Sequence, residues 1–340
     1  MKTMMRAILL LLSSLLAAAA SSSHEDRCHP DDKAALLAIK AALSNPHGFA
    51  SWTSNSSCCD WYEVDCDIFT GRVTHLTVVE DDTVAGAIPD AVGDLAHLEY
   101  LDLSHLKALS GPIPPAIARL SNLSMLTISW TAVSGPVPAF LSELAALTDL
   151  DLSHNSLAGA IPPSLALLPN LVSLDLRHNR LTGPLPPLLF SRAPQGEEGE
   201  AHLTLSRNNL TGGIPAEWSA VRFQEIDLSE NSLTGDASPL FGAVKPLRYL
   251  DLYRNGFSFN FSAVELPEER LSYFDVSHNA IYGGIPAQAA NLTDLYIFDV
   301  SYNQLCGEVP KNMASLDAGM FEHNKCLCGS PLPPCRSKIE

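Results

Sequence analysis

The residues of this 340-residue sequence that could do chemistry are aspartates that recur at one position of a repeat of about 24 residues. Each follows the first apolar residue of a Leu-x-Leu unit, so their carboxylates would lie in line on neighbouring strands. Such a row could attract a basic partner surface, or two members could serve as acid and base in glycoside hydrolysis. The alternative is that these aspartates mainly accept hydrogen bonds from neighbouring hydroxyl or backbone groups. The row comprises Asp102, Asp151, Asp175, Asp227, Asp251, Asp275 and Asp299.

Two more columns of the same unit are predicted to project from the same face. The column just before the first apolar residue varies most along the chain, so we expect it to determine partner choice, with tyrosines as anchors. The third column, just before a recurring Asn, holds His154 and His178 one strand apart, but no carboxylate is reserved for them and we expect no metal site. These columns add Tyr100, Asp149, His178, His202, Glu225, Tyr249 and Tyr273 to the predicted partner-binding residues.

Catalysis is not expected from this sequence. It contains no Gly-x-Ser-x-Gly elbow, phosphate loop or His-Glu-x-x-His motif. Acid catalysis by a carboxyl group needs a raised pKa, which we do not expect in an exposed row. We therefore predict no catalytic residue, no cofactor and no metal. With 21 Lys and Arg against 38 Asp and Glu, the formal net charge of -17 also argues against nucleic-acid binding.

The columns arise because the chain repeats, with ten strand markers from Leu76 to Phe298 at steps of 23 to 29 residues. The Leu-x-Leu segment alternates apolar and polar residues, as a strand with one buried face does. The Asn that follows can bond neighbouring backbone, while the next Gly and Pro permit a turn and end the pairing. A single unit cannot bury its own apolar face, so stacked units must form the core. The sequence predicts an α/β solenoid, a right-handed curved superhelix with a concave parallel β-sheet and about ten repeats.

All eight cysteines lie outside Val73–Leu305 and are predicted to form disulfide-bonded caps at both ends. Four cysteines within one group can pair in three ways, and a bond between the adjacent Cys58 and Cys59 would be strained. Residues 30–43 begin with Pro30 and an acidic first turn, which predicts a capping helix. A zinc site at the C-terminal Cys-Leu-Cys is disfavoured. The preferred pairs are Cys28–Cys58, Cys59–Cys66, Cys306–Cys326 and Cys328–Cys335.

The first residues have the pattern of a secretory signal peptide. Lys2 and Arg6 precede an apolar run that ends at Ala20, and this run is shorter than the ~20 residues needed to span a bilayer. A retained membrane anchor is the alternative. The expected division is a signal peptide at 1–20, an N-terminal cap at 21–72, repeats at 73–310 and a C-terminal cap at 311–340.

Five Asn-x-Ser/Thr sequons occur along the chain. In a secreted protein they are expected glycosylation sites, although one or two can remain unoccupied. Their glycans would shield surface away from any partner. The sequons begin at Asn55, Asn122, Asn209, Asn260 and Asn291.

The repeat resembles the plant extracellular leucine-rich repeat, LxxLxLxxNxLxGxIPxxLxxLxx, from about Val73 to Pro310. The eighth repeat departs from the Gly-Ile-Pro pattern in DLYRNGFSFNFSAVELPEERL. This departure, the ending HNKCLCGSPLPPC and the N-terminal CHPDDKAALLAIKAAL and SSCCDWYEVDC together resemble the polygalacturonase-inhibiting proteins of plants. The segment PQGEEGE at 194–200 departs from that family and lengthens one step to 29 residues, and we expect it to form a solvent loop on the convex side. The second and third repeats also depart, with Leu106 and Thr131 in place of the Asn.

The resemblance implies a secreted protein of the plant cell wall that binds fungal endopolygalacturonases through its concave face and limits pectin degradation. We expect a monomer with no membrane span. Pectin or an oligogalacturonide is a second expected ligand, because Arg177, Arg207 and Arg254 could contact uronic acids. The rival is a ligand-binding repeat protein of the cell wall, acting in receptor signalling or in regulating the plant's own pectinases. A receptor would continue into a membrane span, and because only five residues follow Cys335 we expect a free inhibitor.

Overall fold

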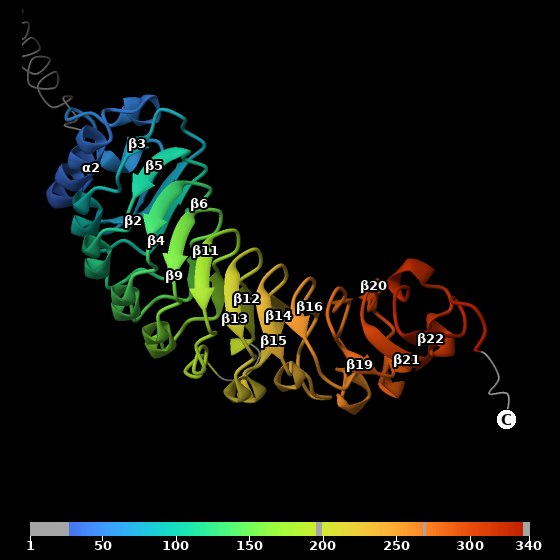
Figure 1. The fold of residues 1–340 in the computed structure, drawn as a ribbon. Coiled ribbons are helices and arrows are strands. Elements are labelled where there is room, and N and C mark those ends of the chain that lie inside the picture. Colours follow the sequence, from blue (N-terminus) through green and yellow to red (C-terminus); the bar gives the residue numbers. More distant parts are fainter. Residues whose placement is uncertain (1–26, 195–198, 268–269, 336–340) are drawn as a thin grey trace, which may run out of the picture.

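The computed structural model describes residues 27–194, 199–267 and 270–335, which wind into a curved solenoid (Figure 1). Its concave side is an 11-stranded sheet with the order β1-β2-β4-β6-β8-β10-β12-β14-β16-β18-β20. Strand β1 is antiparallel to β2, and the strands after β2 pair in parallel, as the repeat pattern predicts. The strands are β1 (Val64–Cys66), β2 (Val73–Val79), β4 (Tyr100–Ser104), β6 (Met125–Ser129), β8 (Asp149–Asp151), β10 (Ser173–Asp175), β12 (Ala201–Thr204), β14 (Phe223–Asp227), β16 (Tyr249–Asp251), β18 (Tyr273–Asp275) and β20 (Ile297–Asp299).

A second set of strands follows the recurring Asn of each turn. Eight of them form a parallel sheet, here named the lateral sheet, with the order β17-β15-β13-β11-β9-β7-β5-β3. The strands β19, β21 and β22 form a separate sheet after it. Their bounds are β3 (Ala85–Gly86), β5 (Ala108–Gly111), β7 (Ala132–Gly135), β9 (Ser156–Gly159), β11 (Arg180–Gly183), β13 (Asn209–Gly212), β15 (Ser232–Gly235), β17 (Gly256–Phe257), β19 (Tyr282–Gly283), β21 (Gln304–Glu308) and β22 (Cys326–Cys328).

Short 3-10 helices return the chain along the convex side. In the regular repeats the Pro of Gly-x-Ile-Pro or its equivalent is the residue before the helix, since its fixed φ suits a helix start and it cannot donate to a sheet. The helices are η1 (His47–Ser51), η2 (Cys58–Asp60), η3 (Asp90–Asp94), η4 (Pro115–Arg119), η5 (Ala139–Glu143), η6 (Pro163–Leu167), η8 (Ala216–Ala220), η9 (Ser238–Leu240), η10 (Phe261–Ala263), η11 (Ala287–Asn291), η12 (Lys311–Met313) and η13 (Ala318–Met320).

In most repeats an Asn joins its own turn to the preceding turn. Asn208 is buried, and its Nδ2 donates to the carbonyls of Leu176 at 2.9 Å, Leu205 at 3.1 Å and Ser206 at 3.3 Å. Its Oδ1 accepts from the amide of Leu181 at 2.9 Å. Six other asparagines donate in the same way to their own and the preceding turn: Asn155, Asn179, Asn231, Asn255, Asn279 and Asn303. Since four bonds depend on one side chain, the polar Asn is the turn's structural centre. 

The second and third repeats have other residues in place of the Asn. Leu106 is fully buried in the core. The hydroxyl of Thr131 donates to the side-chain oxygen of Asn155 in the next turn and accepts from the amide of Val133 at 3.2 Å.

The N-terminal end of the core is covered by helix α2 (Pro30–Ala42). Leu36, Ile39 and the following Leu43 are buried, as the capping-helix prediction requires. The helix is tied to β2 by Asp32, which is fully buried and accepts from Arg72 Nη2 at 2.6 Å and from the amide of Val73 at 2.8 Å. A buried carboxylate needs such partners to offset its lost hydration.

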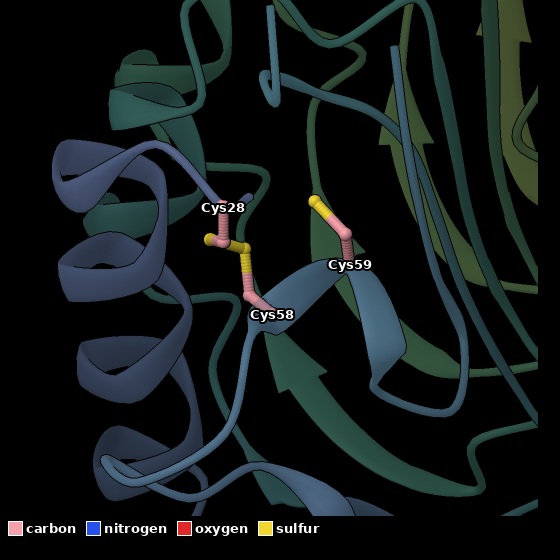
Figure 2. A group of neighbouring side chains, drawn as sticks. All are labelled: Cys28, Cys58 and Cys59. Atoms are coloured by element: carbon pink, nitrogen blue, oxygen red, sulfur yellow. A yellow bond between two sulfur atoms is a disulfide. The ribbon is translucent and has the colours of Figure 1, made fainter. Parts of the chain in front are cut away.

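Four disulfides hold the caps. Figure 2 shows Cys28 bonded to Cys58 beside α2, while the adjacent Cys59 belongs to a separate bond with Cys66. At the other end Cys306 pairs with Cys326, and Cys328 with Cys335. These are the four pairs of the preferred set.

Within the described residues, no helix is both long enough and apolar enough to cross a membrane. The predicted signal peptide at residues 1–20 lies outside that part of the chain. 

The prediction that PQGEEGE is a solvent loop is wrong at its end. Residues 195–198 lie outside the described residues, but Gly199 and Glu200 are buried. Glu200 accepts from Arg222 Nη2 at 3.2 Å, Gln224 Nε2 at 3.0 Å and Arg270 Nη1 at 3.3 Å. The longer spacing before the sixth repeat therefore places the Glu200 carboxylate where it bonds side chains of later turns.

Replacing Glu200 by alanine should destabilise the fold by ~1–3 kcal/mol, because the buried carboxylate that accepts from Arg222, Gln224 and Arg270 would be lost. Chemical denaturation of the variant measures this loss. Glu217, an exposed glutamate of η8, provides the control, whose alanine variant should change stability by less than ~0.5 kcal/mol. Equal stability of the two variants would show that the Glu200 network contributes nothing.

Candidate functional site

The concave sheet brings most of the predicted partner-binding residues together in register. His202 pairs with Glu225, Glu225 with Tyr249, and Tyr249 with Tyr273, so these four side chains are successive members of one column. Asp149 continues this column towards the N-terminus through Ser173. Tyr100 and Asp102 lie apart, on β4, with β6 between them and β8.

Tyr249 and Tyr273 form a flat aromatic pair on this face. Their ring centroids are 4.3 Å apart with an interplanar angle of 13°. Both side chains are partly buried, and burial with the neighbouring carboxylates raises the pKa of each hydroxyl well above its usual value. The pair is therefore a neutral, rigid platform that needs little further ordering to bind a partner.

A polar pair lies next to this platform. His202 Nδ1 is 3.4 Å from Glu225 Oε2, and both side chains are more than one third exposed. Since exposed pairs contribute little to stability, these groups remain available to a partner.

The aspartate row has a structural role in addition to its charge. Asp151 Oδ1 accepts from the amide of Ser153 at 2.8 Å, two residues along, and this contact stabilises the turn after the strand. The same contact is made by Asp175, Asp227, Asp251, Asp275 and Asp299. This geometry agrees with the interpretation that the aspartates bond neighbouring backbone.

The expectation that the exposed row would lack raised pKa values is wrong. Burial raises the pKa of Asp175 to about 7 and that of Asp251 to about 7, with a further contribution from neighbouring carboxylates. The pKa values of Asp102 and Asp275 are also raised by burial. The row is therefore less negative in mildly acidic solution than the formal charges indicate, and the pKa argument against acid catalysis does not hold.

The column before the Asn has a conformation that sequence reasoning missed. Its members, from Glu80 and His105 to Tyr302, all have positive φ angles between 51° and 58°. Non-glycine residues rarely adopt this left-handed conformation, so their regular recurrence is a property of the turn. The only sequence feature that marks these left-handed residues is their position before the Asn, and a repeat period does not reveal a dihedral angle.

These left-handed residues stack their rings along one rim of the concave face. The ring centroids of Trp130 and His154 are 3.6 Å apart, and those of His154 and His178 are 4.1 Å apart. Trp130 is 48% exposed, so the stack offers an aromatic surface to solvent. Burial and the nearby His178 and Arg177 lower the pKa of His154 to about 4, which keeps its ring neutral above that pH.

Two arginines of the concave face are already paired. Arg177 Nε is 3.1 Å from Asp175 Oδ2, and Arg207 Nε is 2.7 Å from Glu230 Oε1. They border a shallow cavity of about 480 Å³, which His178, Asp227 and Tyr273 also line.

A metal site has little support in the described residues. The group of potential ligands found there is Cys28, Cys58 and Cys59, and all three are disulfide-bonded. The rings of His154 and His178 are stacked with their centroids 4.1 Å apart, so they pack against each other rather than pointing their nitrogens at a shared ion.

The raised carboxyl pKa values predict a pH dependence of stability. Their ordinary value is 3.8, so between about pH 4 and 7 the folded chain holds more protons on Asp175 and Asp251 than the unfolded chain. Stability from this source is present at low pH and is lost as pH rises towards 7. Because the lowered pKa of His154 acts in the opposite direction, the test compares variant with wild type at each pH. Relative to wild type, the double variant D175N/D251N should gain stability from pH 5 to pH 8 in urea denaturation; a constant difference would contradict this account.

Comparison with protein-family models identifies a leucine rich repeat N-terminal domain at residues 29–67 and a leucine rich repeat at residues 137–181. The chain is 49% identical over 325 residues to a polygalacturonase inhibitor of Pyrus communis, with 92% of this chain and 93% of that protein covered. A polygalacturonase inhibitor of Vitis vinifera is 49% identical over 311 residues, with 92% of each chain covered.

Among solved structures, a plant ice-binding protein matches with a TM-score of 0.87 and 44% identity. The match covers 92% of this chain and all of the other. This chain therefore shares its fold with that protein over most of its length.

Proposed function

This chain belongs to the polygalacturonase-inhibitor family of leucine-rich-repeat proteins, and from that membership we propose that it binds fungal endopolygalacturonases and blocks their hydrolysis of pectin. The relatives are inhibitor proteins, and we infer a binding role without catalysis for this chain. The family and the N-terminal repeat domain suggest an extracellular protein. We propose the plant cell wall as its location.

The observation that supports the concave face as the binding surface is the stacked pair of Tyr249 and Tyr273. Tyrosine is enriched among the residues that contribute most to protein interfaces, particularly where its ring is held in place beforehand. Here the parallel sheet fixes both rings, and the carboxylates of Asp227, Asp251 and Asp275 lie around them. A partner with a basic cleft rim would match this charge, and binding there would obstruct access of the pectin chain.

Direct binding of pectin or an oligogalacturonide has weaker support. Uronic-acid carboxylates need cations, and Arg177 and Arg207 are paired with Asp175 and Glu230. Arg254 remains exposed, with its guanidinium 5.1 Å from the centroid of the Tyr253 ring. We propose that such a ligand binds to the complex of this chain with the enzyme rather than to the free chain.

The proposed function is tested with purified protein and a panel of fungal endopolygalacturonases. Pectin hydrolysis is measured as the release of reducing ends, with increasing amounts of the protein. Inhibition of at least one enzyme at a saturating one-to-one ratio supports the proposal. Full activity of every enzyme, together with no binding in calorimetry, would contradict it and would favour a receptor-type ligand-binding role.

A second candidate function, suggested by the ice-binding relative, rests on the lateral sheet. The residue before the Gly of each strand is a small hydroxyl residue in most turns, and Thr182, Thr211 and Thr234 are exposed on three consecutive strands. Thr182 pairs with Asn209 and Thr211 with Ser232, so successive threonines are offset by two residues along the strands. Their hydroxyls form an oblique, regularly repeating row that could hold ordered water. 

Ice recrystallisation in the presence of the protein tests this candidate. Replacing Thr234 by lysine should abolish any inhibition of ice growth and leave polygalacturonase inhibition unchanged. The matched control is Ala145→Lys on the exposed convex side. If both variants slow ice growth as wild type does, the hydroxyl row is not an ice-binding surface.

A further inference from the structure

The lateral sheet is interrupted at the eighth repeat, where the Gly-Ile-Pro pattern is missing. Its last strand is β17, and the chain continues only through an isolated parallel bridge between Asn260 and Tyr282, the first residue of β19. A cavity of about 320 Å³ lies at this interruption. Its lining includes Asp236, Ser258, Phe259, Asn260, Val264 and Tyr282.

Asn260 is the acceptor residue of the sequon Asn260-Phe261-Ser262, and its side chain is held in a defined orientation. Its Oδ1 accepts from the amide of Ser262 at 3.2 Å and from the hydroxyl of Ser262 at 2.6 Å, which caps η10. A backbone N–H can only donate, so the atom facing it must be the amide oxygen. The same oxygen lies against Gly283, where an added Cβ would be 2.1 Å from it, so this packing requires a glycine.

The amide nitrogen of Asn260 is consequently the atom left for other partners. In the described part of the chain, Nδ2 has no hydrogen-bond partner, and the residue is exposed at the edge of the cavity. A substituent on this nitrogen would leave Oδ1 in place, so the cap of η10 would be kept.

The residues that line the cavity suit the binding of one sugar ring. Phe259 and Val264 are buried and give it an apolar floor, while Tyr282 is 47% exposed and presents its ring as a wall. Asp236, Ser238 and Ser258 are exposed and supply carboxylate and hydroxyl groups. An amphipathic ring with an apolar face and equatorial hydroxyls fits such a lining, and a cavity of this volume is near the lower end of small-ligand sites.

We propose that the first N-acetylglucosamine of the glycan expected at Asn260 occupies this cavity. In the transfer, the bond between Nδ2 and sugar C1 forms and the bond from C1 to the phosphate of a polyprenyl-diphosphate donor breaks. The diphosphate leaves with the electron pair, and the amide nitrogen loses a proton. The seated sugar then covers the floor at Phe259 and fills the interruption of the lateral sheet.

This proposal depends on passage through the secretory pathway and not on the inhibitor function. Asn122 provides the reference, since it is an exposed sequon in a turn between η4 and β6. The full chain is secreted from a eukaryotic host, and glycopeptides are quantified by mass spectrometry after timed treatment of the folded protein with peptide N-glycosidase. The glycan at Asn260 should be released about tenfold more slowly than that at Asn122, and at the same rate after denaturation.

Two variants distinguish binding of the sugar in the cavity from its covalent attachment to Asn260. Tyr282→Ala keeps the sequon and removes the wall, so occupancy at Asn260 should be unchanged while release becomes as fast as at Asn122. Asn260→Asp keeps an oxygen that can cap η10 but removes the acceptor nitrogen, so the glycan should be lost without loss of folding. An unmodified Asn260, release at the rate of Asn122 in wild type, or slow release that persists in Tyr282→Ala would overturn the proposal.

Discussion

Replacing Tyr249 and Tyr273 together by alanine is expected to weaken inhibition of a susceptible endopolygalacturonase by about 30- to 1,000-fold. The two rings are stacked at 4.3 Å on adjacent strands of the concave sheet, so the double variant removes one continuous contact surface. Loss of a central aromatic anchor typically costs ~2–4 kcal/mol of binding free energy. Inhibition constants measured at one fixed pH and salt concentration give this change directly.

The matched control removes two aromatic rings elsewhere. Tyr62 is 67% exposed and Phe69 is 89% exposed, both in the N-terminal cap. The Y62A/F69A variant should inhibit within about twofold of wild type, because surface truncations away from an interface change little. If the control loses inhibition and Y249A/Y273A keeps it, the cap and not the concave face binds the enzyme.

Replacing Asn208 by alanine is expected to destabilise the protein by ~2–4 kcal/mol. Its side chain donates to three carbonyls and accepts from the amide of Leu181, and all of these groups lie in the interior. Alanine would leave several buried polar groups without partners, which is costly because no water replaces the lost bonds. The loss is measured by chemical denaturation with circular dichroism.

Asn170 supplies the control for this prediction. It is exposed, and its side chain makes one hydrogen bond, to the carbonyl of Ala145 at 2.9 Å. Its alanine variant should lose no more than ~1 kcal/mol. Comparable losses for the two variants would mean that the Asn contacts between turns do not hold the solenoid together.

Much of this architecture was predictable because the repeat is a local pattern. The alternation around Leu101 or Leu174 reports a strand with one buried side, and a fixed period places successive strands next to each other. The same period also shows which residues form each column of the concave face. The pairing of cysteines such as Cys28 and Cys58 was limited to a few choices by their grouping at the two ends.

Other features depend on distances in three dimensions that the period does not contain. The pKa of Asp251 is raised because neighbouring turns bury its carboxyl group and place Asp227 and Asp275 beside it. Glu200 is buried because Arg222 and Arg270, 22 and 70 residues away, converge on it, although its segment has the composition of a solvent loop. The cavity at Asn260 requires both the interruption of the lateral sheet and the packing of Gly283.

The central claim, that the concave face binds the polygalacturonase, is tested most directly by hydroxyl-radical footprinting of the free protein and of its complex with an inhibited enzyme. Oxidation of Tyr249, Tyr273 and His202 should fall when the enzyme is bound, while oxidation of Tyr62 and Phe69 in the N-terminal cap stays unchanged. Unaltered oxidation of the three concave residues, with protection of the cap or of the lateral sheet, would contradict the claim.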